Sequence, residues 1–291
     1  MKNILITGGS GFIGRNLKES LNKTYHIFAP SHQELDLLNT ELLENFIDDN
    51  QIDVIIHGAI HVGMFNGYEN ILLNDIIMFN NIEKVSHKVE KVLYFGSGAE
   101  YDKSYDISMV TEDMIGNHIP KSDYGIAKYT MNLVARSSNN IYNLRLFGIF
   151  GKYELWDIKF ISNIICKVLF DIPITIRKEC YFDYLYIEDL PEIIKWFISN
   201  TPKYHDYNVC MGVPFSLSDL VKIVLTTMDK PMKYTFLSEG IANEYTANNT
   251  RLKDEIVNLK ITPIQEAIKD LISYYKDHLY EINYEKLQAS R

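Results

Sequence analysis

The stretch NILITGGSGFIG, residues 3–14, decides the fold of this chain of 291 residues. Its first half is an apolar run that is typical of a buried strand. Gly8, Gly11 and Gly14 follow and lead into a helical pattern. A tight turn requires Gly8, close approach of a pyrophosphate requires Gly11, and helix–strand contact requires Gly14. Because a helix N-terminus also supplies backbone donors to an anion, the stretch predicts a dinucleotide-binding loop.

Strands and helices alternate in this way to about residue 151. Further apolar runs predict buried parallel strands in HIFAP (26–30), DVIIHGA (53–59), KVLYFGS (91–97) and YNLRLFGIFG (142–151). The alternation predicts an α/β fold: a Rossmann-type doubly wound parallel sheet with a smaller α+β substrate lobe. We expect residues 1–152 and about 183–205 to form the coenzyme lobe, and 153–182 and 206–291 the smaller lobe.

Composition excludes several classes of protein. The net charge of −9 argues against nucleic acid as a partner. No apolar run reaches the roughly 18 residues of a membrane helix. Three cysteines without a CxxC pattern indicate a reducing compartment, so a cytoplasmic protein is expected.

The end of the second expected strand bears on the choice of coenzyme. An NAD site usually has a carboxylate there, whereas this chain reads Ala29-Pro30-Ser31-His32. Ser31 and His32, with Arg15 or Ser10, are candidates to receive a 2′-phosphate. NADP(H) is therefore favoured. If this segment is only a polar loop, NAD(H) is possible.

A catalytic group is predicted from SDYGIAK, which places Tyr124 and Lys128 on one face of a helix. An ammonium beside a phenol favours the phenolate and lowers a pKa that is ordinarily near 10. Ser97 ends the fourth strand, where its hydroxyl can polarise a substrate carbonyl. Taken alone, Tyr124 and Lys128 would be interpreted as surface residues, and Ser97 as a hydroxyl bonded to the backbone. Together with a dinucleotide loop in the same chain, they predict an acid–base site.

These motifs occur in the order seen in extended short-chain dehydrogenases/reductases, and the chain resembles their nucleotide-sugar epimerase/dehydratase family. HGAIHVG (57–63) and NTRLKDEI (249–256) are most similar to GDP-L-fucose synthases. The resemblance implies a Ser–Tyr–Lys site, a nucleotide-sugar substrate with GDP favoured, and a homodimer built through a four-helix bundle. It also implies that Asp36 and Leu37 flank adenine, and that the nicotinamide side is lined by Gly58, Ala59, Ile60 and Asn74. The expected coenzyme-binding residues are Gly8, Ser10, Gly11, Phe12, Ile13, Gly14, Arg15, Ser31, His32, Asp36, Leu37, Gly58, Ala59, Ile60, Asn74, Tyr124 and Lys128.

Departures from the family pattern limit the chemistry. Dehydratases of the family carry an Asp-Glu pair where this chain has Gly98 and Ala99, so the acid and base for removing water are missing. Fucose synthases have a cysteine at Ala99 and a histidine at Lys159, so epimerisation is expected to be lost. We expect the small residues after Ser97 to leave room for a bulky ligand.

Substrate contacts also differ. The arginine that the family uses at the diphosphate is Phe182 here, and a family asparagine is Gly148. Lys152, Lys159, Arg177 or Lys178 are candidates for the missing positive charge. The expected substrate-binding residues are Ser97, Gly98, Ala99, Gly148, Lys159 and Arg177.

Taken together, the sequence predicts NADPH-dependent reduction of a nucleotide-linked 4-keto sugar. The alternatives are a 4-epimerase with bound NAD and a non-catalytic dinucleotide-binding regulator. His57 and His61 are spaced like metal ligands, but the glutamate of the metalloprotease motif is missing, so no metal is expected.

Overall fold

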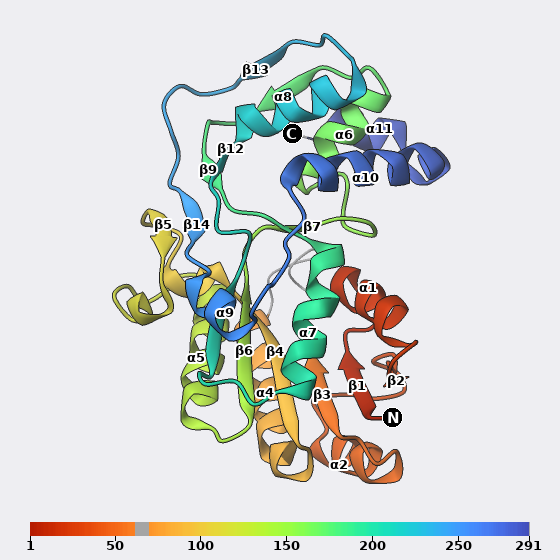
Figure 1. The fold of residues 1–291 in the computed structure, drawn as a ribbon, viewed down its shortest axis with the longest axis vertical. Coiled ribbons are helices and arrows are strands. Elements are labelled where there is room, and N and C mark those ends of the chain that lie inside the picture. Colours follow the sequence, from red (N-terminus) through yellow and green to blue (C-terminus); the bar gives the residue numbers. More distant parts are fainter. Residues whose placement is uncertain (62–69, 291) are drawn as a thin grey trace.

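The large lobe is built on a six-stranded parallel sheet with the order β11-β6-β4-β3-β1-β2 (Figure 1). The computed structural model describes residues 1–61 and 70–290. The strands of this sheet are β1 (Asn3–Thr7), β2 (His26–Phe28), β3 (Val54–His57), β4 (Lys91–Ser97), β6 (Ile141–Leu146) and β11 (Asp206–Val209). Chain order reverses between β1 and β3, and a ligand of a doubly wound sheet binds outside the carboxyl ends of the strands at such a point. The α/β prediction is confirmed.

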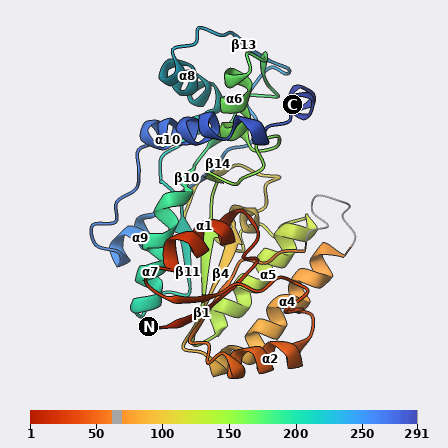
Figure 2. The same cartoon turned by 90° about the vertical axis from the view of Figure 1, so that its right-hand side faces the viewer.

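Helices cover both faces of this sheet, as the edge-on view shows (Figure 2). Ile4 and Ile6 point into one core and Leu5 into the other, so successive residues of β1 are buried on opposite faces. This explains why the strands are apolar throughout instead of alternating with polar residues. The helices are α1 (Phe12–Leu21) and α7 (Leu190–Ser199) on one face, and α2 (Thr40–Asp49), α4 (Ile71–Val85) and α5 (Asp123–Ser137) on the other.

The smaller lobe lies above the carboxyl ends of the strands in Figure 1. Its four-stranded sheet has the order β12-β9-β14-β5, made of β12 (Phe215–Ser216), β9 (Tyr181–Phe182), β14 (Tyr245–Ala247) and β5 (Ile107–Val110). Two-stranded pairs join β8 (Ile174–Ile176) to β13 (Tyr234–Phe236), and β7 (Ile149–Phe150) to β10 (Leu185–Tyr186). Its helices are α6 (Phe160–Leu169), α8 (Leu217–Met228), α10 (Ile264–Asp277) and α11 (Tyr284–Ala289), whereas α9 (Thr250–Glu255) packs against β11 at the edge of the large sheet (Figure 1). Single 3₁₀ turns are η1 (Ser86–Lys88), η2 (Gly98–Tyr101), η3 (Glu112–Met114), η4 (Ile187–Asp189) and η5 (Leu279–Glu281).

Two strands cross the lobe boundaries expected from the sequence. Residues 206–209 were assigned to the smaller lobe, but β11 pairs in parallel with β6 as the edge of the large sheet. Conversely, β5 lies within residues 1–152 and pairs with β14 of the small sheet. The boundary expected at residue 206 is therefore misplaced, because strand pairing across more than 60 residues leaves no local mark in the sequence.

Local signals in the sequence predicted the ends of helices more reliably than they predicted the lobe boundaries. Asn39 accepts a hydrogen bond from the Leu42 amide at the start of α2, and Ser216 accepts one from Asp219 at the start of α8. The three cysteines are unpaired and buried. Among the described residues, no helix combines the length and apolar character that crossing a membrane requires.

Candidate functional site

The turn between β1 and α1 has the shape of a phosphate cradle. Gly8 has φ +73°, and a side chain at Gly14 would lie 2.2 Å from the Gly8 carbonyl oxygen. Gly11 is the N-cap of α1; no side chain caps this helix end and its first turn has no acidic residue. The first amides of α1 are therefore available to an anion, and these residues fit the pyrophosphate of a dinucleotide.

The carboxyl end of β2 contains an acid that the sequence analysis missed. The backbone amide and hydroxyl of Ser31 both donate to one Glu34 carboxylate oxygen, at 2.7 and 2.9 Å. These hydrogen bonds hold the pKa of Glu34 below its usual value. Arg15, expected to meet a 2′-phosphate, instead stacks 3.8 Å above the centre of the Tyr153 ring. Ser31 and Glu34 are three residues apart, a spacing that allows a hydrogen-bonded turn. This spacing is the signal in the sequence that could have revealed the contact of Glu34 with Ser31.

Beside the glycine turn lie the residues expected around the nicotinamide. A side chain at Gly8 would come within 2.9 Å of the Gly58 and Ala59 backbone, so the two loops are in contact. The Ala59 amide donates to the Thr7 hydroxyl, and the Asn74 amide nitrogen lies 3.3 Å from the His61 ring. Ile60 is half-buried beside them, and the last two residues of HGAIHVG lie outside the described residues. Asp36 and Leu37 lie beyond β2, where Asp36 accepts a hydrogen bond from the Leu38 amide and Leu37 is buried.

Ser97, Tyr124 and Lys128 converge at the carboxyl end of β4. Ser97 is the last residue of that strand, and Tyr124 and Lys128 lie one turn apart at the start of α5. The Lys128 ammonium donates to the Phe95 carbonyl oxygen at 2.9 Å and lies 5.9 Å from the centre of the Tyr124 ring. The Ser97 hydroxyl lies close enough to the Tyr124 hydroxyl to lower the pKa of Tyr124. The structure thus brings together the three side chains that the sequence singled out.

The ionisation of Tyr124 differs from the expectation. Burial raises the pKa of Tyr124 to about 12, and the Ser97 hydroxyl offsets only part of this rise. The carboxylates of Glu100 and Asp75 add to it. Lys128 was expected to favour the phenolate, but its own pKa is lowered by burial and its ammonium is bonded to a backbone carbonyl. In the chain alone, Tyr124 is therefore a protonated phenol at neutral pH.

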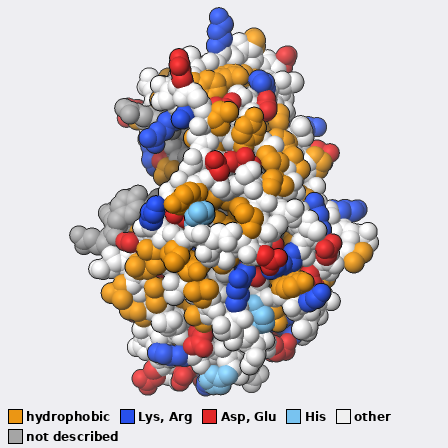
Figure 3. All heavy atoms as spheres, turned by 90° about the vertical axis from the view of Figure 1, so that its left-hand side faces the viewer, with side chains coloured by type: hydrophobic (Ala, Val, Ile, Leu, Met, Phe, Trp, Pro, Cys, Tyr) orange, Lys and Arg blue, Asp and Glu red, His pale blue; other side chains and the backbone are white. Residues whose placement is uncertain are grey.

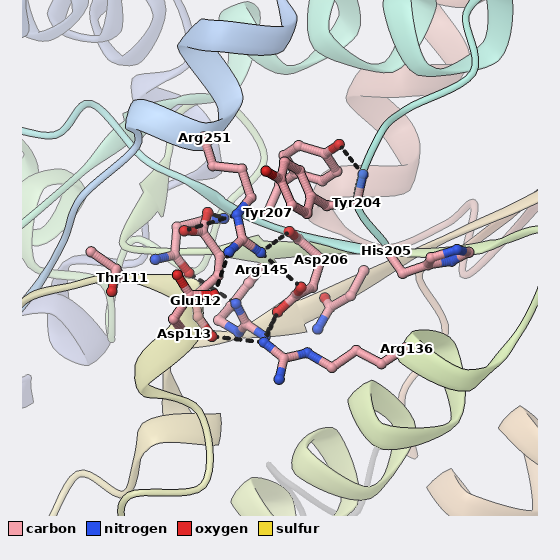
Figure 4. A network of polar contacts seen from close by, with 12 residues as sticks. Thr111, Glu112, Asp113, Arg136, Arg145, Tyr204, His205, Asp206, Tyr207 and Arg251 are labelled. Atoms are coloured by element: carbon pink, nitrogen blue, oxygen red, sulfur yellow. Dashed lines mark hydrogen bonds and ion pairs between the residues drawn. The ribbon is translucent and has the colours of Figure 1, made fainter.

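A buried ionic network fixes the position of Ser97. The Glu100 carboxylate accepts a hydrogen bond from the Ser97 amide at 3.0 Å and pairs with the Arg145 guanidinium at 2.7 Å. Arg145 is fully buried and also contacts Asp206 at 3.0 Å. Arg136 and Arg251 reach the same Asp206 carboxylate, so three arginines converge on one acid (Figure 4). Sequence reasoning missed this network because its members come from distant segments.

The space beside Gly98 is filled by protein. A side chain at Gly98 would lie 2.5 Å from both the Phe147 ring and the Tyr245 hydroxyl. The expectation that Gly98 leaves room for a ligand is therefore wrong, whereas Ala99 is buried within the 3₁₀ turn η2. Gly148 has φ +41° and abuts the Asp183 carbonyl oxygen, so packing requires a glycine there as well.

The expected substrate cations have different surroundings. Lys152 is committed to Glu19 and Glu188, each at 3.1 Å. Lys159 is exposed at the start of α6, and Arg177 is exposed just beyond β8. Lys103 is a further cation near this position that the sequence did not suggest. Desolvation lowers the pKa of Lys103, and the nearby positive charge of Lys159 lowers it further. Basic side chains also line the waist between the two lobes (Figure 3).

The paired histidines do not form a metal site with other side chains among residues 1–61 and 70–290. His57 is buried and its ring nitrogen lies 2.9 Å from the Thr7 hydroxyl. Burial lowers the pKa of His57 to about 3, and the Lys128 charge adds to this effect. His57 is therefore a neutral packing residue at the base of the site.

With this geometry established, comparison with known proteins is informative. A family model described as "NAD dependent epimerase/dehydratase family" matches residues 4–210. The chain belongs to this family. Among curated relatives, it is 26% identical to the GDP-L-colitose synthase of Yersinia pseudotuberculosis over 76% of this chain and 80% of that protein. It is 24% identical to the GDP-L-fucose synthase of Dictyostelium discoideum, with 95% and 96% covered.

Solved structures of this family share the fold across both lobes. A GDP-L-fucose synthetase from Naegleria fowleri has a TM-score of 0.83 at 17% identity, covering 96% of this chain and 94% of that one. A GDP-mannoheptose C4 reductase from Campylobacter jejuni with NADP bound gives 0.79 at 17%, covering 94% and 98%. A UDP-glucose 4-epimerase from Thermotoga maritima gives 0.82 at 19%, covering 95% and 99%. Reductases and epimerases therefore share this architecture.

Proposed function

We propose that this family member reduces the ketone of a nucleotide-linked 4-keto sugar to a hydroxyl, with NADPH as coenzyme and without epimerisation at neighbouring carbons. The observation that carries the proposal is the convergence of Ser97, Tyr124 and Lys128 beside the glycine turn. A GDP-linked substrate is favoured by the curated relatives of similar sequence.

The protonation state of Tyr124 suits reduction. A reduced nicotinamide supplies the hydride that the ketone carbon gains. The ketone oxygen then takes its proton from Tyr124, whose pKa of about 12 keeps the phenol protonated at neutral pH, and the phenolate recovers a proton from solvent. The Ser97 hydroxyl donates to the same oxygen, and the Lys128 ammonium stabilises the phenolate that forms.

Residues 98 and 99 restrict the reaction to this step. Neither Gly98 nor Ala99 has an ionisable side chain, so no acid or base reaches the adjoining sugar carbons from this turn. Packing of Tyr245 and Phe147 against Gly98 closes the space that a dehydratase acid would need. Chemistry at C4 itself remains, which is reduction in this proposal and 4-epimerisation in the alternative.

The choice of coenzyme depends on Glu34. The sequence favours NADPH, and the similar Campylobacter reductase has NADP bound. The Glu34 carboxylate weighs the other way, because it occupies both Ser31 donors and repels a 2′-phosphate. We propose that the enzyme uses NADPH, and that the Glu34 carboxylate reduces the difference in affinity between NADPH and NADH.

The proposed partner is a second copy of the chain. Leu73 on α4 is 56% exposed and Leu133 on α5 is 45% exposed. Half-buried Leu72, Ile76 and Val134 lie on the same two helices. Apolar side chains gather over this lower part of the molecule (Figure 3). Pairing α4 and α5 with their counterparts would bury them in a four-helix bundle.

Incubation with NADPH and GDP-, CDP-, UDP- and dTDP-linked 4-keto sugars tests the function. The expected result is one NADPH oxidised for each sugar reduced. Turnover without net coenzyme oxidation would identify a 4-epimerase instead. Tyr124→Phe is expected to lower kcat by about 10²- to 10⁴-fold while coenzyme binding is retained. Tyr129→Phe, also on α5, is the matched control. An unchanged kcat in Tyr124→Phe would show that Tyr124 is not the proton donor, whereas coenzyme binding without turnover of any of these sugars would favour a non-catalytic regulator.

A further inference from the structure

A small pocket at the junction of the two lobes shares no lining residue with the Ser97–Tyr124–Lys128 group. It lies where α10 of the small lobe sits above α1 of the large lobe (Figure 2). Arg15 of α1 forms one wall, the segment after β7 forms a second, and the end of α10 with η5 forms the third. Its volume is about 170 Å³, which suits a ligand the size of a benzene ring with one substituent.

Aromatic rings make up most of the pocket walls. Tyr153 and Trp156 come from the segment after β7, and Tyr274, Tyr275 and His278 come from α10 and its C-cap. The Tyr153 and Tyr274 rings meet edge to face with 5.9 Å between centroids, and His278 stacks on Tyr274 at 4.2 Å. Tyr153 has φ +71°, a left-handed conformation that is costly for a residue other than glycine. Backbone strain of this kind concentrates at ligand-binding sites.

Two of these rings already contact cations of the protein. The Arg15 guanidinium lies 3.8 Å above the centre of the Tyr153 ring, and the Lys286 ammonium lies 5.6 Å from the centre of the Trp156 ring. The faces of tyrosine and tryptophan rings attract positive charge. Walls of this kind therefore favour a cationic ligand over a neutral ligand of the same shape.

Two buried oxygen atoms supply the polar end of the pocket. Glu154 and Tyr275 are only 4% and 3% exposed. Ser162 donates a hydrogen bond to Glu154 Oε1, whereas Glu154 Oε2 and Tyr275 Oη have no hydrogen-bond partner among the described residues. An ionised carboxylate is costly to bury without a partner, and an ammonium group has three donors to offer. Exposed Arg15 and Glu281 offset one another in charge, so an ionised Glu154 leaves a negative charge for a ligand to neutralise.

We propose that this pocket binds a small organic cation, whose ammonium group donates hydrogen bonds to Glu154 Oε2 and Tyr275 Oη between the aromatic walls. The site goes beyond the proposed reduction, because its lining requires neither the coenzyme nor Ser97. Since the walls come from α1 and α10, the bound cation contacts both lobes at once.

Tryptophan fluorescence gives a direct readout of this pocket. Trp156 is one of two tryptophans in the chain, so Trp196→Phe leaves it as the only indole. Benzylammonium is the probe, and benzyl alcohol is the neutral control of nearly the same shape. Burial raises the pKa of Glu154 to about 7, so the titration is run without coenzyme at about pH 8, where the carboxylate is ionised. The expected result is a saturable change with benzylammonium, and about tenfold weaker binding of benzyl alcohol.

Glu154→Gln in the same background removes the charge and keeps the shape of the side chain. It should weaken the binding of benzylammonium about tenfold and leave that of benzyl alcohol unchanged. Tyr274→Leu removes one aromatic face and should weaken benzylammonium about two- to fivefold. Glu266→Gln, an exposed acid in the first turn of α10, is the matched control.

Three results would overturn the proposal. They are the lack of a saturable response to benzylammonium, equal affinities for the two probes before Glu154 is changed, and undiminished binding of benzylammonium by Glu154→Gln. Coenzyme binding measured on each variant shows that it is folded, so a lost response is assigned to the pocket.

Discussion

Ser97 illustrates how much a single proposed catalytic residue depends on its surroundings. Its amide donates to Glu100, and its hydroxyl oxygen accepts from the Ala99 amide. A short side chain at a strand end has few rotamers, and these contacts select among them. Precise orientation of a small donor is what stabilisation of a developing oxyanion requires.

Glu34 provides a prediction at the same scale. Glu34→Gln removes a negative charge that faces the expected position of a 2′-phosphate, while the Ser31 donors are retained. The Kd for NADPH should fall by about three- to tenfold and that for NADH should stay the same. Glu41→Gln, an exposed acid in the first turn of α2, is the control. Fluorescence titration of both coenzymes measures the change; equal shifts for the two coenzymes would show that Glu34 does not select between them.

The expected site residues that the structure brings together have local signals in the sequence. The glycines, Tyr124 and Lys128 follow fixed spacings within one turn or one helix, so they were identified without knowledge of the fold. Glu34 sits only three residues from Ser31, but its role depends on the conformation of a loop. Arg145 reaches Glu100 from β6, 45 residues further along the chain. Nothing in the sequence around Arg145 marks it as a partner of Glu100.

At the scale of elements, the segment between β7 and α6 contains an acid with a pH-dependent effect. Glu154 is buried, accepts a hydrogen bond from Ser162 on α6, and has one carboxylate oxygen without a partner among the described residues. Burial raises the pKa of Glu154 from 4.5 to about 7, although Ser162 and the Lys159 charge oppose the rise. The protonated form is therefore the one that suits the folded state.

This acid predicts a loss of stability as pH rises. The contribution of Glu154 is fully present below pH 4.5 and is lost as the pH rises through about 7, a change on the order of 3 kcal/mol. Urea unfolding of Glu154→Gln should lack this part of the decline. Burial also raises the pKa of Asp183 to about 7, so the Glu154→Gln variant still shows the part of the pH-dependent loss of stability that Asp183 causes. Identical pH profiles for the two proteins would show that Glu154 is not the group responsible.

For the whole molecule, the network around Arg145 joins segments that are far apart in the sequence. Arg145 on β6 contacts Glu100 and Asp206, while Arg251 on α9 joins Asp206 to Asp113 beyond β5. Strand pairing likewise places β5 and β11 in the opposite lobe from the one expected. Both kinds of pairing cross the boundaries expected from the sequence, because those boundaries divide the chain into consecutive segments.

Breaking this network should destabilise the entire chain. Arg145→Met leaves two buried carboxylates without their main partner, and the expected loss is about 3–5 kcal/mol of unfolding free energy. Exposed Arg177→Met should change it by less than about 0.5 kcal/mol. Urea denaturation of both variants gives the comparison. A loss in Arg145→Met no larger than in Arg177→Met would mean that the network contributes little to stability.

The central claim is hydride transfer at a site built by Ser97, Tyr124 and Lys128, and an isotope measures it most directly. NADPH carrying deuterium at the B-face position of the nicotinamide is incubated with the 4-keto sugar nucleotide that is turned over. The account predicts one deuterium at the sugar C4 for each coenzyme oxidised, formed about 10²- to 10⁴-fold more slowly with Tyr124→Phe. A product without deuterium at C4, or deuterium recovered in reduced coenzyme after sugar turnover, would contradict it.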